Sequence, residues 1–122
     1  MAHLYELRGK LVVDHATGLM WQQSGSPNSM FYADAEKYIR DLNNQRFAGY
    51  HDWRLPTLEE TMSLMEPKAH GDLYLDSIFD RKQRWIWTAD EESTGVALVV
   101  YFSSGYCNPL PITSLYYVRG VR

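Results

Sequence analysis

The longest apolar stretch of the sequence, Val96 to Phe102, limits the fold more than any other feature. A membrane-spanning helix needs about 20 predominantly apolar residues, and no stretch of this chain approaches that length, so membrane insertion is not expected. A short apolar run without alternation is typical of a strand that is buried on both faces. The sequence therefore predicts a domain built around a sheet, with Val96–Phe102 as a central strand.

Other stretches also have the character of strands. Leu11–Val13 and Leu19–Gln22 flank the turn-forming residues of Asp14–Gly18, which is the pattern of a hairpin. Trp85–Thr88 and Tyr116–Val121 are rich in the aromatic and β-branched residues that favour strands. Since strands fall at both ends of the chain and helices between them, the N- and C-terminal strands are expected to lie close together.

Two helices are predicted in the middle of the chain. Apolar residues recur at helical spacing over Phe31–Asn44, and either Asn28 or Ser29 can cap the first turn. Thr57 and Glu60 have the spacing of a capping box, which predicts the start of the second helix. The expected fold class is α+β, with two helices packed on a mixed or antiparallel sheet.

Length, charge and cysteine content restrict the organisation further. The 122 residues suit one domain, and we expect residues 11–122 to form it, with residues 1–10 as an N-terminal extension. A net charge of −3 argues against nucleic-acid binding, which needs a dense basic face. The single cysteine, Cys107, cannot form an internal disulfide, and an inert thiol is expected. The first six residues lack the basic and apolar regions of a signal peptide, which leaves the compartment open.

The sequence contains none of the common catalytic or zinc-binding motifs. An enzyme would need groups distant in sequence to converge, for example His51, Asp52 and Glu59. Calcium is an alternative rather than an expectation, because neither Asp90–Glu92 nor the acidic residues spaced every four positions has a complete calcium-loop pattern. Those spaced residues, which would share one face if a helix formed there, are Asp72, Asp76 and Asp80.

The stretch from Ser103 to Tyr116 has the composition of a binding loop. Tyrosine offers contact area at low entropic cost, and serine and asparagine adapt their hydrogen bonds to a ligand. The competing interpretation, about equally supported, is an ordinary polar connection stiffened by two prolines. The residues expected to contact a ligand are Ser103, Ser104, Tyr106, Asn108 and Tyr116, with Trp87 or Tyr101 adjoining.

Four blocks of sequence together resemble a known bacterial family, the domain of unknown function at the C-terminus of Legionella collagen-like adhesins. The blocks are Val13–Gln22, Gly49–Thr57, Trp85–Thr88 and Tyr117–Arg122, and the resemblance spans roughly residues 11–122. It implies a C-type-lectin-like fold related to that of the formylglycine-generating enzymes. It also implies trimers and binding to sulfated polysaccharides, although this chain is acidic and has no collagen repeats.

The resemblance further implies that the blocks are mostly structural. The residues assigned this role are Trp21, Trp53, Arg54, Pro56, Thr57 and Trp85. Arg54 is expected to hold a buried carboxylate or backbone carbonyls, with Asp52 as one candidate partner. The calcium motifs of the lectins are missing, and the formylglycine-generating enzymes use a pair of cysteines where this chain has one.

These observations favour a non-catalytic binding module without a cofactor, which recognises a protein or a glycan through the Ser103–Tyr116 stretch. A structural or assembly domain of a larger adhesin or fibre is the first alternative. A homo-oligomer is possible under either function. An enzyme related to the formylglycine-generating enzymes is the second. The sequence separates the first two poorly, because both need exposed apolar surface.

Overall fold

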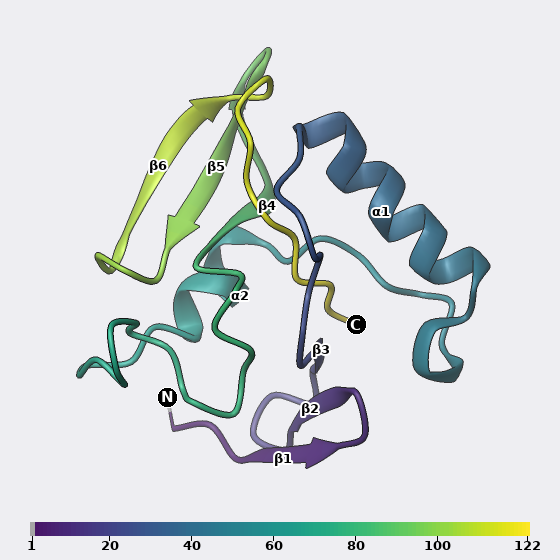
Figure 1. Ribbon diagram of the computed structural model, residues 1–122, viewed down its shortest axis with the longest axis vertical. Helices are drawn as coiled ribbons and strands as arrows, with labels where there is room; N and C mark the ends of the chain where they lie inside the picture. Colours follow the sequence, from purple (N-terminus) through teal and green to yellow (C-terminus); the bar gives the residue numbers. More distant parts are fainter. Residues whose placement is uncertain (1) are drawn as a thin grey trace.

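The computed structural model describes residues 2–122, which form two three-stranded antiparallel sheets and two helices (Figure 1). The predicted α+β class is confirmed. The first sheet contains β1 (Tyr5–Arg8), β2 (Leu11–Asp14) and β3 (Met20–Gln22), and the second contains β4 (Trp85–Ser93), β5 (Val96–Tyr101) and β6 (Tyr106–Pro111). Between them in sequence lie helix α1 (Tyr32–Asn44), the short 3-10 helix η1 (Phe47–Gly49) and helix α2 (Leu58–Ser63).

The first sheet includes the predicted hairpin, with β2 at its centre and β3 on one side. The turn is closed by Asp14, whose carboxylate accepts hydrogen bonds from the amide of Ala16 at 3.0 Å and the hydroxyl of Thr17 at 2.9 Å. The segment set apart as an N-terminal extension contributes β1, which pairs with β2 along its whole length. This segment is therefore part of the sheet.

The second sheet has β5 in the middle, between β4 and β6, which confirms the predicted central strand. Its side chains reach two apolar clusters. Ala97 and Val99 belong to the cluster under α1, and Val100 belongs to the cluster under α2. Phe102, just past the end of the strand, joins the second cluster. The strand thus links the two halves of the core.

Both helices form where the sequence predicts them. Helix α1 buries Tyr32, Ala35, Ile39 and Leu42, the apolar stripe of an amphipathic helix. Its predicted cap is wrong, because Phe31 holds the N-cap position and no side chain caps the first turn. The predicted second helix is confirmed by a complete capping box between Thr57 and Glu60 (described below).

The C-terminal segment, in which residues 116–121 were expected to be a strand, forms single bridges to several elements instead. Tyr116 bridges Met30, Tyr117 bridges Ile86 of β4, and Val121 bridges Trp21 of β3. In Figure 1 this yellow segment runs between the second sheet and α1. The C-terminal segment nevertheless lies beside the N-terminal sheet, since the amide of Met20 donates to the carbonyl of Arg122 at 2.8 Å.

The acidic residues of the irregular stretch do not share a helix face, because no helix forms between α2 and β4. Asp72 pairs with Arg84 at 2.6 Å, and Asp80 accepts a hydrogen bond from Ser24 at 2.7 Å. Asp76 caps a local turn by accepting from the amide of Ile78 at 2.9 Å. Each carboxylate therefore has a separate structural partner.

Candidate functional site

The middle of the stretch predicted as a binding loop is a strand. β6 is the edge strand of the second sheet, and turns lie on either side of it, at residues 103–105 and 112–114. The amide of Ile112 donates to the carbonyl of Gly95 at 3.0 Å, so even-numbered residues direct their amides toward β5. Pro109 and Pro111 therefore occupy outward-facing positions that need no N–H group. These prolines leave β6 a poor edge for the addition of another strand.

Tyr106 and Asn108 of β6 are exposed side chains on one face of this sheet. They pair in register with Tyr101 and Val99 of β5, so the four side chains point to the same side. The next residue of that parity, Leu110, packs against the cluster under α1. Tyr106 is 69% exposed, the largest exposure of any large apolar side chain in residues 2–122. A rigid sheet thus presents Tyr106 and Asn108 to solvent.

Further aromatic side chains extend this surface. The hydroxyls of Tyr101 and Tyr116 are 2.7 Å apart, and their rings meet edge to face with centroids 5.8 Å apart. The ring of Trp85 on β4 lies 6.4 Å from that of Tyr101. Burial and the hydrogen bond to Tyr116 raise the pKa of Tyr101 to about 12, which keeps its hydroxyl protonated. We call Trp85, Tyr101, Tyr106, Asn108 and Tyr116 the aromatic face.

The remaining predicted ligand residues lie elsewhere. Trp87 has no exposed surface, and its indole donates a hydrogen bond to the carbonyl of Met30 at 2.9 Å. The expectation that Trp87 adjoins the ligand is therefore wrong, and Trp85, two residues earlier on the same face, replaces it. Ser103 is half-buried and Ser104 exposed in the turn beyond the face. Cys107 is exposed on the opposite side of β6.

The convergent catalytic group that an enzyme would need does not form from the residues named in the sequence analysis. Asp52 pairs with Arg122 through contacts of 2.5 and 3.0 Å, and this guanidinium lowers the pKa of the carboxyl. No hydrogen bond joins Asp52 to the exposed His51 or Glu59 within residues 2–122. In the same described part of the chain, no three metal-binding side chains are arranged to hold a metal ion.

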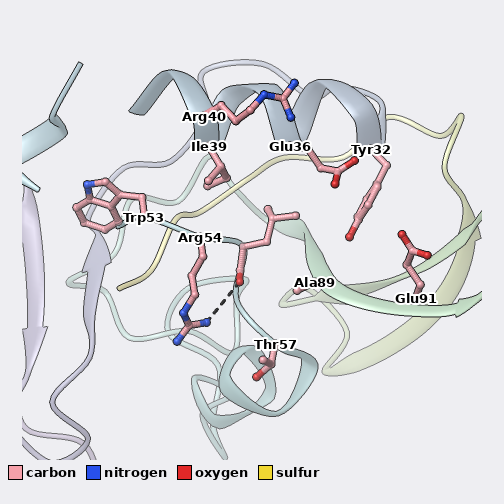
Figure 2. A pocket seen from close by; sticks show the side chains of 10 residues that line it. Tyr32, Glu36, Ile39, Arg40, Trp53, Arg54, Thr57, Ala89 and Glu91 are labelled. Atoms are coloured by element: carbon pink, nitrogen blue, oxygen red, sulfur yellow. Dashed lines mark hydrogen bonds between the residues drawn. The ribbon is translucent and has the colours of Figure 1, made fainter. Parts of the chain in front are cut away.

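A separate cleft of about 520 Å³ lies where α1, β4 and the segment before α2 meet (Figure 2). Its floor is formed by the buried side chains of Ile39, Trp53 and Leu55, and Tyr32 lines one end. Charged groups stand around the mouth; they are Glu36, Arg40, Arg54 and Glu91. This cleft and the aromatic face use opposite ends of β4.

Comparison with known families settles what kind of domain this is. Residues 10–122 match the family described as the Lcl C-terminal domain. The chain belongs to this family. The resemblance found in the sequence is therefore confirmed over nearly the whole chain. Among curated proteins, none matches the chain. None of the helices in residues 2–122 is long and apolar enough to cross a membrane.

The most specific block of this Lcl domain, residues 52–57, joins α1 to α2. Trp53 is buried, donates its indole N–H to the carbonyl of Phe47 at 3.0 Å, and is held by two hydrogen bonds with Asn43. The carbonyl of Pro56 accepts a hydrogen bond from Ala89 of β4 at 2.7 Å. Thr57 then caps α2. The block therefore ties both helices to the second sheet.

Arg54 of the Lcl domain binds a carboxylate as a bidentate donor, but its partner is the half-buried Glu60 and not the candidate Asp52, through two contacts of 2.7 Å. Arg54 itself is exposed, so the expected burial of this pair is not found. The fully buried arginine is Arg119, which donates to the carbonyls of Gln22, Gln23 and Asp80 and to the side-chain oxygen of Gln83. Burial lowers its pKa to about 10, so it stays charged at neutral pH. No local pattern distinguishes the two arginines, because the partners of Arg119 are 36 to 97 residues away.

Proposed function

We propose that this Lcl domain is a non-catalytic binding module whose ligand rests on the aromatic face. The observation that carries the proposal is the exposure of Tyr106 and Asn108 beside partly buried aromatic rings, on a rigid sheet. Such rings offer contact area with little loss of conformational freedom, because the sheet already holds them in place. An adhesin-associated family is compatible with this role.

The chemistry of the aromatic face suits a ligand with apolar surfaces and hydrogen-bonding groups. Its five side chains include three phenol hydroxyls, an indole and an amide, and none carries a carboxyl, imidazole or thiol group. A protein surface or the face of a sugar ring meets this description. The outward prolines of β6 disfavour a ligand that binds by adding a strand, so we propose recognition through side chains.

The test is a screen of the purified domain against glycan arrays and candidate surface proteins, followed by substitution of the face. Tyr106→Ala and Asn108→Ala should each weaken binding of any captured ligand, while the folded state keeps its stability because both side chains are exposed. Leu7→Ala and Asn44→Ala serve as matched controls, since both residues are exposed and lie outside the face. A ligand that binds equally well to all four variants would refute the proposed surface.

A second candidate function, assembly within a larger adhesin or fibre, is favoured by exposed leucines at the other end of the molecule. Leu4 and Leu7 are 63% and 55% exposed, and Leu7 lies on the edge strand β1. Sedimentation velocity on the wild type and on Leu7→Glu distinguishes the two functions. An oligomer that Leu7→Glu dissociates would support assembly, whereas a monomer in both cases would count against it.

We also propose that the domain has the C-type-lectin-like fold that the family implies. It predicts that the aromatic face lies on the sheet used for recognition rather than on the N-terminal hairpin. Lectins of this fold commonly bind sugars through calcium. We propose that binding to the aromatic face does not need calcium. Ligand binding that survives excess chelator would support this, and binding abolished by chelator would overturn it.

A further inference from the structure

The cleft between α1 and β4 has a floor and a mouth of different chemistry. Apolar side chains cover its floor, where Ile39, Trp53 and Leu55 are each less than a tenth exposed. At one end of the cleft, Glu36 of α1 and Glu91 of β4 flank Tyr32 from opposite walls (Figure 2). A side chain that lies along the cleft therefore has hydrocarbon beneath it and two carboxylates at one end.

The cations around the cleft do not neutralise these carboxylates. Arg54 is fully engaged by Glu60, through two contacts of 2.7 Å at the end of α2. Arg40 runs along the outer side of α1 in Figure 2, and it makes no ion pair within residues 2–122. Glu36 and Glu91 likewise have no ion-pair partner in the described chain. Negative charge at this end of the cleft is therefore available to a ligand.

The phenol between the two carboxylates responds to this charge. Tyr32 donates its hydroxyl to the carbonyl of Thr88 at 3.2 Å, and burial is the main reason that its pKa is raised to about 12. The charges of Glu36 and Glu91 raise the pKa of Tyr32 further. Both carboxylates are thus close enough to Tyr32 to raise its pKa. This agrees with their position on either side of Tyr32 at one end of the cleft.

We propose that this cleft binds a lysine or arginine side chain presented by a partner polypeptide. The aliphatic stem lies over Ile39 and Leu55, and the charged head reaches Glu36 and Glu91. Long basic side chains suit this shape because they bury a hydrocarbon stem while their head keeps polar contacts. Clefts of about 300 to 1,000 Å³ commonly hold ligands in proteins, and this cleft falls within that range.

The proposed interaction is independent of the aromatic face. Trp85 at the start of β4 belongs to that face, whereas Ala89 and Glu91 near the end of the strand line the cleft. The buried Trp87 separates the two surfaces. The domain therefore offers two sites of different chemistry, and failure of one proposal leaves the other standing.

The test uses three capped tripeptides and the isotope-labelled domain, followed by NMR titration. Acetyl-Gly-Lys-Gly-amide should cause saturable shifts at the Trp53 indole and at the backbone of Glu91. Acetyl-Gly-norleucine-Gly-amide, which keeps the stem and lacks the charge, should bind at least about fivefold more weakly, as expected for the loss of two exposed charge contacts. Acetyl-Gly-Glu-Gly-amide should cause no saturable shift.

Variants then locate the contacts. The double variant Glu36→Gln/Glu91→Gln should lose the preference for lysine over norleucine, and Glu59→Gln, an exposed carboxylate outside the cleft, should keep it. Arg40→Gln should strengthen lysine binding, because it removes the nearest competing cation. Equal affinity for lysine and norleucine in the wild type, an unchanged preference in the double variant, or shifts confined to the aromatic face would each overturn the proposal.

Discussion

Replacement of Arg119 by methionine should destabilise the domain more than any surface substitution. Arg119 has no exposed surface and no carboxylate in contact. Its two terminal nitrogens donate to four oxygens of the protein, whereas its buried Nε has no acceptor within residues 2–122. Its guanidinium also lies 4.9 Å from the ring centroid of Phe79. Methionine keeps an unbranched apolar stem, but it is shorter than arginine and removes every one of these hydrogen bonds. The perturbation therefore removes the polar contribution of Arg119 together with the packing of its guanidinium on Phe79.

The magnitude follows from the acceptors that Arg119→Met leaves behind. Asp80 O and Gln83 Oε1 accept no other hydrogen bond within residues 2–122, and each buried acceptor without a donor costs about 1–3 kcal/mol. Removal of a buried charge returns part of this free energy, because the guanidinium no longer has to be desolvated. We therefore expect the free energy of unfolding to fall by about 3 kcal/mol.

Chemical denaturation at neutral pH measures this change, with Arg40→Met as the matched control. Arg40 is exposed and makes no ion pair in the described chain, so its replacement should change stability by less than about 0.5 kcal/mol. Arg119→Lys should fall between the wild type and Arg119→Met, because lysine keeps the charge but cannot span acceptors in a planar fork. A loss below about 1 kcal/mol for Arg119→Met would refute the reasoning.

Two further predictions concern the N-terminal hairpin and α2. His3 donates to Asp14 at 2.5 Å and to the carbonyl of Ser63 at 2.7 Å. Burial lowers the pKa of His3, but these hydrogen bonds together with the negative charges of Asp14 and Glu66 outweigh burial and raise the pKa overall. The stability that His3 contributes should be complete below its ordinary pKa of about 6.5 and be lost as pH rises through the raised value. Denaturation midpoints should thus fall with rising pH in the wild type and change less in His3→Gln, and parallel curves would contradict this. Thr57→Ala should lower the free energy of unfolding by about 1 kcal/mol, because the amide of Glu60 loses its 3.1 Å cap, whereas the exposed Thr113→Ala should be neutral.

Local signals in the sequence predicted the elements whose stabilising contacts are close in the chain. The stripe of α1 depends on residues three or four positions apart, and the capping box of α2 depends on Thr57 and Glu60 alone. In the capping box, the Glu60 carboxylate accepts from the amide of Thr57 at 2.9 Å. The hairpin between β2 and β3 depends on a turn whose residues bond to Asp14. Each of these elements is therefore readable from a short window.

Elements that depend on distant partners were not predicted correctly. Strand β6 contains Pro109 and Pro111, which argue against a strand until the register shows that both face outward. The last segment has strand-forming residues, but the bridges that it makes are divided among Met30, Ile86 and Trp21, so no continuous ladder forms. A short stretch of sequence does not show which distant residues these segments will contact.

The composition of the aromatic face shows why the sequence alone could not tell which of two tryptophans stays partly exposed. Trp85 and Trp87 are two residues apart on β4, so both point to the same side of the sheet. Trp87 is buried because Tyr32 and Tyr116 pack edge to face on its ring, at 5.2 and 5.3 Å between centroids. Within residues 2–122, Trp85 has only the ring of Tyr101 as an aromatic neighbour, and its side chain stays partly exposed. The boundary of the proposed ligand surface is thus set by where α1 and the C-terminal segment stop covering the sheet, rather than by the residues of β4 themselves.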